Sequence, residues 1–166
     1  NALSVSYTGV QLAQRVLGTL SGLRVLLIGA GEAGQLVARA LRTSGANDLM
    51  IANRTPQRSE ELARSLDGRA IPFKEIGLAV GDADVVIAAT GASSYVLTRD
   101  DFASAPGTPN RRSQVLIDLS VPRNIDPEAA TVDGISLYNI DDLSTIAEEN
   151  LQGRRESAAD AEAIVT

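Results

Sequence analysis

Residues 24–34 read RVLLIGAGEAG, and this stretch decides the fold. The apolar run from Arg24 to Ile28 predicts a buried β-strand. From Glu32 to Ser44 the apolar side chains share one face of a helix, which Gly45 is placed to end. The stretch therefore predicts a strand, a tight glycine-rich turn and a helix in direct succession.

The turn fits the pattern G-x-G-x-x-G. In a dinucleotide-binding fold the first glycine makes the tight turn, the second lets the backbone approach a pyrophosphate, and the third lets helix and strand pack closely. The N–H groups and dipole at the helix start favour that negative charge. We predict a dinucleotide site; the alternative is the same strand, turn and helix without a ligand. The predicted binding residues are Gly29, Ala30, Gly31, Glu32, Ala33 and Gly34.

The residues after the second predicted strand, Leu49 to Ala52, indicate which dinucleotide binds. An NAD site usually carries Asp or Glu at this point, which bonds the ribose 2′-hydroxyl. No carboxylate is present here, and the guanidinium of Arg54 offers a planar set of donors to a 2′-phosphate. We predict NADP(H) as the cofactor; the alternative is surface arginines paired with Glu60 or Glu61. The predicted binding residues are Asn53, Arg54 and Thr55, which with Pro56 opens a helix, and Arg58 one turn further on.

Two later strands end in residues that suit the same edge of the sheet. The strand from Asp84 to Ala89 is followed by Thr90 and Gly91, and small residues there leave room for the nicotinamide half of the cofactor. We predict that both bind it, with an ordinary turn cap as the alternative for Thr90. Asp118 and Arg123 end the strand at 115–119; they either contact the cofactor or pair with each other or with loop backbone.

Strands alternate with helices along the rest of the chain, which predicts an α/β fold. The expected architecture is a doubly wound, mostly parallel sheet, the Rossmann fold, with flanking helices and a long C-terminal helix. We assign residues 1–22 to a linker helix, 23–140 to the NADP(H)-binding domain and 141–166 to the start of the long helix. The remaining elements are expected at 6–20 (helix), 70–71 (strand), 73–80 (short helix), 104–113 (exposed loop) and 135–138 (strand).

The amino-acid composition limits the kinds of metal site and catalysis that the chain can support. The 166 residues contain no Cys and no His, which removes thiolate and imidazole metal ligands and the commonest nucleophile and near-neutral base. The formal net charge is −6, so the chain lacks the basic surface that grips an RNA backbone. No apolar run is long enough to span a bilayer, and we expect a cytoplasmic protein.

Several longer motifs resemble glutamyl-tRNA reductase. They are GAGEAG at 29–34, ANRT at 52–55, DADVVIAATGA at 82–92, IDLSVPRNIDP at 117–127, and LYNIDDL at 137–143 followed by ENLQGRR at 149–155. The first two also occur in shikimate dehydrogenases. The resemblance runs from Ser6 to the C-terminus.

The resemblance implies an NADPH-dependent oxidoreductase of tetrapyrrole (porphyrin) biosynthesis, which reduces glutamyl-tRNA to glutamate-1-semialdehyde. In that family an N-terminal domain recognises the tRNA and holds the glutamyl group as a Cys thioester. The middle domain, which this chain resembles, brings the hydride, and a long helix leads to a C-terminal domain that forms a homodimer.

We expect the chain to match only the cofactor domain, because it contains no Cys and stops within the long helix. Alone it should bind NADPH, be inactive on glutamyl-tRNA, and be monomeric or weakly associated. The distal half of the helix is polar nearly all round and should fray without a partner. The alternatives are the cofactor domain of a shikimate-type dehydrogenase and a stand-alone NADP(H)-binding sensor module.

Overall fold

The computed structural model describes residues 2–103, 113–146 and 148–149. Six strands form one parallel sheet in the order β3-β2-β1-β4-β5-β6. This is the strand order of the doubly wound dinucleotide-binding fold, so the predicted fold class is confirmed. The strands are β1 (Arg24–Ile28), β2 (Asp48–Ala52), β3 (Arg69–Ala70), β4 (Val85–Ala88), β5 (Gln114–Asp118) and β6 (Ile135–Asn139).

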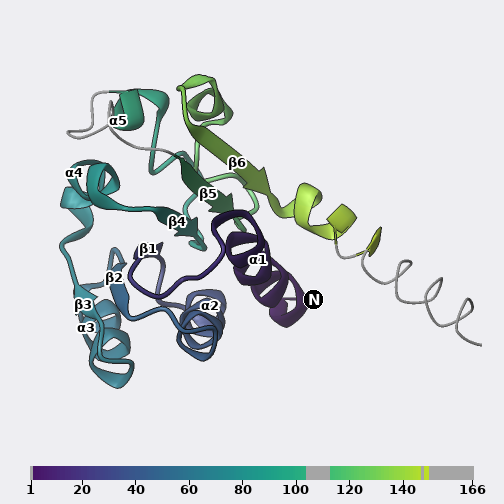
Figure 1. The fold of residues 1–166 in the computed structure, drawn as a ribbon. Coiled ribbons are helices and arrows are strands. Elements are labelled where there is room, and N and C mark those ends of the chain that lie inside the picture. The colour runs from purple at the N-terminus through teal and green to yellow at the C-terminus, as the bar shows by residue number, and fades with distance from the viewer. Residues whose placement is uncertain (1, 104–112, 147, 150–166) are drawn as a thin grey trace, which may run out of the picture.

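Helices cover both faces of the sheet (Figure 1). The first face carries α1 (Ala2–Leu17), α2 (Glu32–Thr43) and α3 (Pro56–Ser65), with α1 packed beside α2. The second face carries shorter elements. They are α4 (Ile76–Ala79), α5 (Arg99–Ala103) and the 3₁₀ turns η1 (Phe73–Glu75), η2 (Val80–Asp82) and η4 (Pro127–Thr131).

The side chains of the central strands contribute to two separate hydrophobic cores, one under each layer of helices. In β1, Val25 and Leu27 pack against the first face, whereas Leu26 and Ile28 pack against the second. All four are fully buried. Successive strand residues point to opposite faces, so a strand covered on both sides needs the uninterrupted apolar run that the sequence contains.

The chain changes face between β3 and β4, which leaves β1 between β2 and β4. Ile28, at the carboxyl end of β1, pairs with Ala52 on one side and with Ala88 on the other. Open sheets of this type bind ligands at the carboxyl edge, at the point where the strand order reverses. The topology therefore predicts a ligand site at the turns that follow β1, β2, β4 and β5.

The first helix begins and ends earlier in the chain than the sequence predicts. A helix was expected over Ser6 to Leu20, but α1 starts at Ala2 and ends at Leu17. The next residue, Gly18, has a φ of +90°, and its N–H donates to the carbonyl of Gln14 at 2.7 Å. This left-handed residue ends the helix about one turn early. Leu20 is nevertheless buried, because the chain turns back over the first core.

The short elements are less regular than the sequence suggested. The helix expected over Phe73 to Val80 consists of η1, α4 and η2 in succession. The predicted strands match β1 to β6 to within about one residue at each end. Both α5 and η4 were not anticipated, because each is about one turn long and has no clear apolar periodicity. The loop expected at 104–113 lies outside the described residues except for Ser113.

The chain after β6 begins a helix that is described over 140–146 and 148–149. Its start carries a capping box: Asn139 Oδ1 accepts from the N–H groups of Asp141 and Asp142, and Asp142 Oδ2 accepts from the N–H of Asn139 at 2.9 Å. Leu143 is fully buried in the first core. The polar distal half, 150–166, lies outside the described residues, and the divisions expected at residues 22 and 140 stay predictions.

Within the described ranges, none of the helices combines the length and apolar character needed to cross a bilayer. The same ranges contain no group of three or more His, Cys, Asp or Glu that could hold a metal ion.

The burial of Leu143 predicts that the helix after β6 supports the sheet. Leu143→Ala should lower the free energy of unfolding by about 2–5 kcal/mol, the usual cost of removing a buried leucine side chain. The exposed neighbouring position supplies the control, and Ser144→Ala should stay within about 0.5 kcal/mol of the wild type. Equilibrium urea denaturation measures both, and equal midpoints for the three proteins would refute the prediction.

Candidate functional site

The turn after β1 brings three strand ends together. The N–H of Gly29 donates to the carbonyl of Ala52, at the end of β2, at 2.8 Å. Gly29 has a φ of +119°, and a Cβ added there would lie 2.2 Å from the carbonyl oxygen of Ala89, just past β4. Only glycine allows this backbone conformation and this close approach.

The two other glycines of the motif have different surroundings. A Cβ on Gly34 would lie 2.2 Å from the carbonyl oxygen of Gly29, so the first turn of α2 packs directly against the loop. Gly31 is the N-cap of α2, with φ −80° and no side-chain cap, and an added Cβ would meet nothing within 4 Å. The loop therefore leaves open space beside Gly31, next to the unpaired N–H groups of a helix start.

Asn53 braces this loop from the end of β2. Its side-chain oxygen accepts from the N–H of Ala30 at 3.1 Å, and its side-chain nitrogen donates to the carbonyl of Thr55 at 3.1 Å. Both ends of the carboxamide are therefore engaged within the protein. Its side chain therefore supports the shape of the loop. That Asn53 binds the cofactor stays a prediction.

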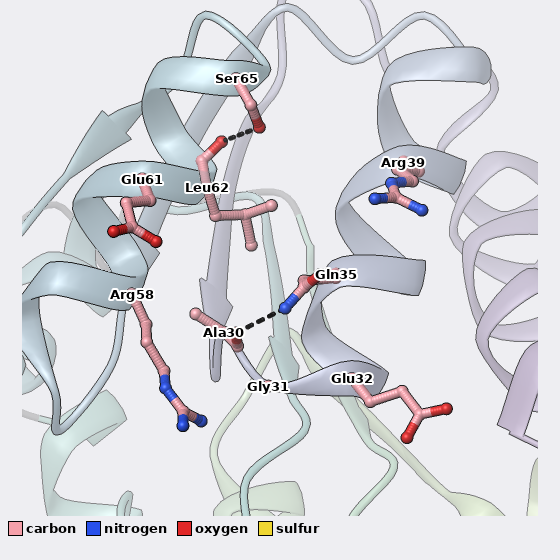
Figure 2. Close-up of a pocket in the computed structure, with 9 residues that line it drawn as sticks. All are labelled: Ala30, Gly31, Glu32, Gln35, Arg39, Arg58, Glu61, Leu62 and Ser65. Atoms are coloured by element: carbon pink, nitrogen blue, oxygen red, sulfur yellow. Dashed lines mark hydrogen bonds between the residues drawn. The ribbon is translucent and has the colours of Figure 1, made fainter.

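A cavity of about 550 Å³ opens between α2 and α3 beside the loop. Figure 2 shows Arg58 extending from α3 to the level of Gly31 and Glu32 at the start of α2. Gln35 closes the loop side by donating to the carbonyl of Ala30 at 3.3 Å. The lining residues are Ala30, Gly31, Glu32, Gln35, Arg39, Arg58, Glu61, Leu62 and Ser65.

Among the described residues, Arg54 and Arg58, which follow β2, are not paired with acidic side chains. In the part of the chain that the structure describes, the ion pairs involve Arg24, Arg69 and Arg123. The alternative that Arg54 or Arg58 pairs with Glu60 or Glu61 is therefore not observed. Arg54 instead stacks on a ring, with its Cζ 4.9 Å from the centroid of Phe73.

Thr55 occupies the N-cap of α3 ahead of Pro56, as the sequence predicted. Its side chain makes no capping hydrogen bond to the helix. Its hydroxyl is therefore placed at a helix N-terminus, the end that attracts anions.

A second cavity, of about 280 Å³, lies on the other side of the loop. It shares Gly31 and Glu32 with the first cavity and reaches the ends of β4 and β5. Its walls are small or apolar except for Glu32 and the hydroxyl-bearing residues Thr90 and Ser120. The lining residues are Gly31, Glu32, Ala33, Ala89, Thr90, Gly91, Leu119, Ser120 and Val121.

The hydroxyl of Thr90 makes two hydrogen bonds within the protein. It donates to Asn124 Oδ1 at 2.6 Å and accepts from the N–H of Ala92 at 3.0 Å. The same Asn124 oxygen accepts from the hydroxyl of Ser120. The side chain of Thr90 thus joins the β4 turn to the β5 loop, and both Thr90 and Gly91 line the cavity. That they bind the cofactor stays a prediction.

Asp118 holds the β5 loop from within. It is almost completely buried, and its carboxylate accepts from the N–H groups of Ser120 at 3.1 Å and of Asn124 and Ile125 at 2.8 Å. Burial raises the pKa of Asp118, although these N–H groups and the nearby Arg123 oppose the shift. Arg123 forms its ion pair with Asp141, at 3.3 Å. For Asp118 the alternative of bonding to loop backbone is thus the observed one.

Sequence reasoning missed the residues that complete the second cavity. Leu119, Ser120 and Val121 follow β5 directly, and Asn124 ties their loop to the β4 turn. The available signal was a short polar and proline-containing run, at 120–124, directly after a buried strand. Gln35 and Arg39, on the second and third turns of α2, were also missed in the first cavity.

Comparisons with known proteins identify relatives of this chain. The family model described as shikimate / quinate 5-dehydrogenase matches residues 11–146. Glutamyl-tRNA reductase from Deinococcus radiodurans is 46% identical over 167 residues, which cover 98% of this chain and 47% of that protein.

Solved structures of a glutamyl-tRNA reductase and of a shikimate 5-dehydrogenase are also similar to this chain. Glutamyl-tRNA reductase from Methanopyrus kandleri matches with a TM-score of 0.84 and 38% identity, over 95% of this chain and 40% of that one. Shikimate 5-dehydrogenase from Thermus thermophilus, in complex with NADP(H) and shikimate, matches with a TM-score of 0.54 and 28% identity, over 80% of this chain and 49% of that one. The chain thus spans about half the length, or less, of these proteins.

The glycine geometry predicts opposite effects for two alanine substitutions. Gly34→Ala should destabilise the fold strongly, because its Cβ would clash with the backbone of Gly29. Gly31→Ala should change the free energy of unfolding by less than about 1 kcal/mol, since its φ is negative and the space is open. Thermal unfolding of both variants tests this. A Gly34→Ala variant as stable as the wild type would contradict the close approach.

Proposed function

The chain belongs to the shikimate / quinate 5-dehydrogenase family and is homologous over nearly its whole length to glutamyl-tRNA reductases, and we propose that it is the NADPH-binding domain of such a reductase. The observation that carries the proposal is the pair of cavities that meet at Gly31, at the start of α2. An elongated ligand with phosphates at its centre and a ring system at each end suits this shape.

The central pyrophosphate of the cofactor would lie against the loop at Gly31. The open space there fits a group that approaches the backbone closely, and the N–H groups at the start of α2 face it. Asn53 supports this site indirectly, because it holds the N–H of Ala30 and therefore the shape of the loop. We therefore propose residues 29–34 as the pyrophosphate-binding residues.

The 2′-phosphate of the adenosine half would be held beyond β2. Arg54 and Arg58 carry no ion pair among the described residues, and the hydroxyl of Thr55 makes no cap bond. Two guanidinium groups without acidic partners and a helix N-terminus favour a dianion. The structure of a Thermus thermophilus relative in complex with NADP(H) supports the choice of cofactor.

The nicotinamide half would enter the second cavity. Ala89 and Gly91 leave room for a ring, and Leu119 and Val121 give it an apolar wall. When bound, NADPH would supply a hydride to an acceptor at this edge. The residues of this chain keep the wall in place, since Asp118 and Asn124 hold the β5 loop through buried hydrogen bonds.

The reaction of the whole enzyme requires more than this chain provides. In the proposed reaction, NADPH reduces glutamyl-tRNA to glutamate-1-semialdehyde, a step of tetrapyrrole biosynthesis in the cytoplasm. The acceptor would be a thioester on a Cys of a separate catalytic domain, which also binds the tRNA, and a further domain would form a homodimer. This chain has neither Cys nor His, so it offers no thiol to form that thioester and no imidazole to activate a thiol.

The cofactor domain of a shikimate-type dehydrogenase is the second candidate, favoured by the family model that matches residues 11–146. The similarity is weaker there: the shikimate dehydrogenase structure has 28% identity and a TM-score of 0.54, against 38% and 0.84 for the reductase. A gene segment that encodes a Cys-bearing domain before Asn1 would support the reductase, and a shikimate-type substrate domain would support the alternative.

We predict that the domain binds NADPH more tightly than NADH. Charge-assisted hydrogen bonds to the 2′-phosphate should contribute about 1.5–3 kcal/mol, or roughly ten- to hundredfold in affinity. Arg54→Ala should remove most of this preference while NADH affinity changes little. Isothermal titration calorimetry with both nucleotides measures the ratio.

Gly31→Val supplies the control for this titration. Its side chain would fill the space where the pyrophosphate approaches, so binding of both nucleotides should be lost while the melting temperature stays close to that of the wild type. Equal affinities of the wild type for NADPH and NADH would refute the preference. Unchanged NADPH affinity in Gly31→Val would show that the loop is not the phosphate site.

We also predict that the isolated domain does not reduce glutamyl-tRNA. Correct positioning of two reactants contributes on the order of 7–11 kcal/mol in well-oriented cases, and the acceptor side of that arrangement is outside this chain. Purified domain, glutamyl-tRNA and NADPH should show no loss of absorbance at the nicotinamide band and no semialdehyde above the protein-free control. Turnover above that control would mean that an acceptor site exists within these 166 residues.

A further inference from the structure

Phe73 lies directly beneath the guanidinium of Arg54, and no motif singled it out. The ring belongs to η1, which follows the edge strand β3. Its side chain is half-buried and packs against the second core, which contains Met50 and Ile76. One side of the ring is therefore held by the core, while Arg54 lies over it at 4.9 Å.

The backbone around Phe73 is held at several points. The N–H of Ile71 donates to the carbonyl of Ile51 in β2 at 2.9 Å. Pro72 has its φ restricted by its ring, and its carbonyl accepts from the N–H of Glu75 at 3.0 Å. The ring is thus attached to the same strand, β2, whose end carries Arg54. The backbone segments that carry Arg54 and Phe73 are therefore both anchored to β2.

A stacked arginine differs in one useful way from an ion-paired one. A carboxylate partner would occupy two of the five N–H donors of the guanidinium. An aromatic ring attracts the cation through its face and leaves the donors at the edge of the guanidinium unused. Arg54 has no carboxylate partner in the ranges that the structure covers, so its position is set by the ring and its hydrogen-bonding capacity stays available.

We propose that Phe73 is a positioning residue for nucleotide selectivity, because it holds the Arg54 guanidinium in place before the ligand binds. The arginine side chain is then already ordered, so binding the 2′-phosphate costs less conformational entropy. This inference rests on the proposed function, because it assigns a cause to the NADPH preference. It concerns Arg54 only; Arg58 lies in the cavity between α2 and α3 and has no ring beneath it in the described structure.

A double-mutant cycle tests the coupling between ring and arginine. The four proteins are the wild type, Phe73→Leu, Arg54→Ala and the double variant, each titrated calorimetrically with NADPH and with 2′,5′-ADP, which carries the phosphate without the nicotinamide. Phe73→Leu should weaken both ligands about two- to fivefold in the wild-type background, the range of an exposed cation–π contact. In the Arg54→Ala background it should have no effect.

Two further variants separate positioning from a general loss of structure. Phe73→Tyr keeps the ring and should keep wild-type affinity. Tyr7→Leu, an equivalent change at an exposed aromatic residue of α1, should alter neither affinity. Melting temperatures are recorded for every variant, so that unfolding is not mistaken for weaker binding.

The outcomes distinguish this inference from the proposed function. A wild type that binds neither nucleotide overturns both. A wild type that prefers NADPH, with Phe73→Leu causing no loss or the same loss in both backgrounds, overturns the role of Phe73 alone. A loss that disappears when Arg54 is absent and is restored by Phe73→Tyr supports it.

Discussion

The two cavities at Gly31 form one cleft, and this cleft depends on a close approach between backbone segments at Gly29 and Gly34. A side chain on Gly29 would collide with the carbonyl of Ala89, and one on Gly34 would collide with Gly29 itself. These contacts bring the end of β1, the start of α2 and the turn after β4 within van der Waals distance. The two cavities lie beside this contact, and both include Gly31 and Glu32 in their lining.

Two carboxamides stabilise the cleft, one on each side of that contact. Asn53 joins the loop after β1 to the end of β2, and Asn124 joins the turn after β4 to the loop after β5. Each connects turns that follow neighbouring strands at the carboxyl edge, where the ladder of backbone hydrogen bonds has ended. A carboxamide suits this task, since it offers both an acceptor and donors and carries no charge that would need a partner.

The elements were predictable from sequence to the extent that their signals are local. The run at 24–28 and the glycines that follow it indicate a strand, a turn and a helix from neighbouring residues alone, and the structure has all three. The roles of Asn53 and Thr90 were not predictable in this way, because their partners Ala30 and Asn124 lie 23 and 34 residues away. One-turn elements such as α5 are equally hard to foresee, since a single turn has no periodicity to detect. A side chain at a strand end can bind a ligand or brace the loops, and only the fold decides between them.

The net charge of −6 poses a question for a site proposed to bind a polyanion. Long-range repulsion from the whole chain is weak at physiological salt, because charges more than about 8 Å apart in solvent are largely screened. The local arrangement decides instead. Arg24 and Arg69 are engaged with Asp48 at the opposite, amino-terminal edge of the sheet, where β1 and β2 begin. At the carboxyl edge, Arg54 and Arg58 lack such partners among the described residues, and the N-termini of α2 and α3 point the same way. An acidic chain can therefore hold a phosphate where its cations are left unpaired, and stacking on Phe73 is one means of holding an arginine there without pairing it.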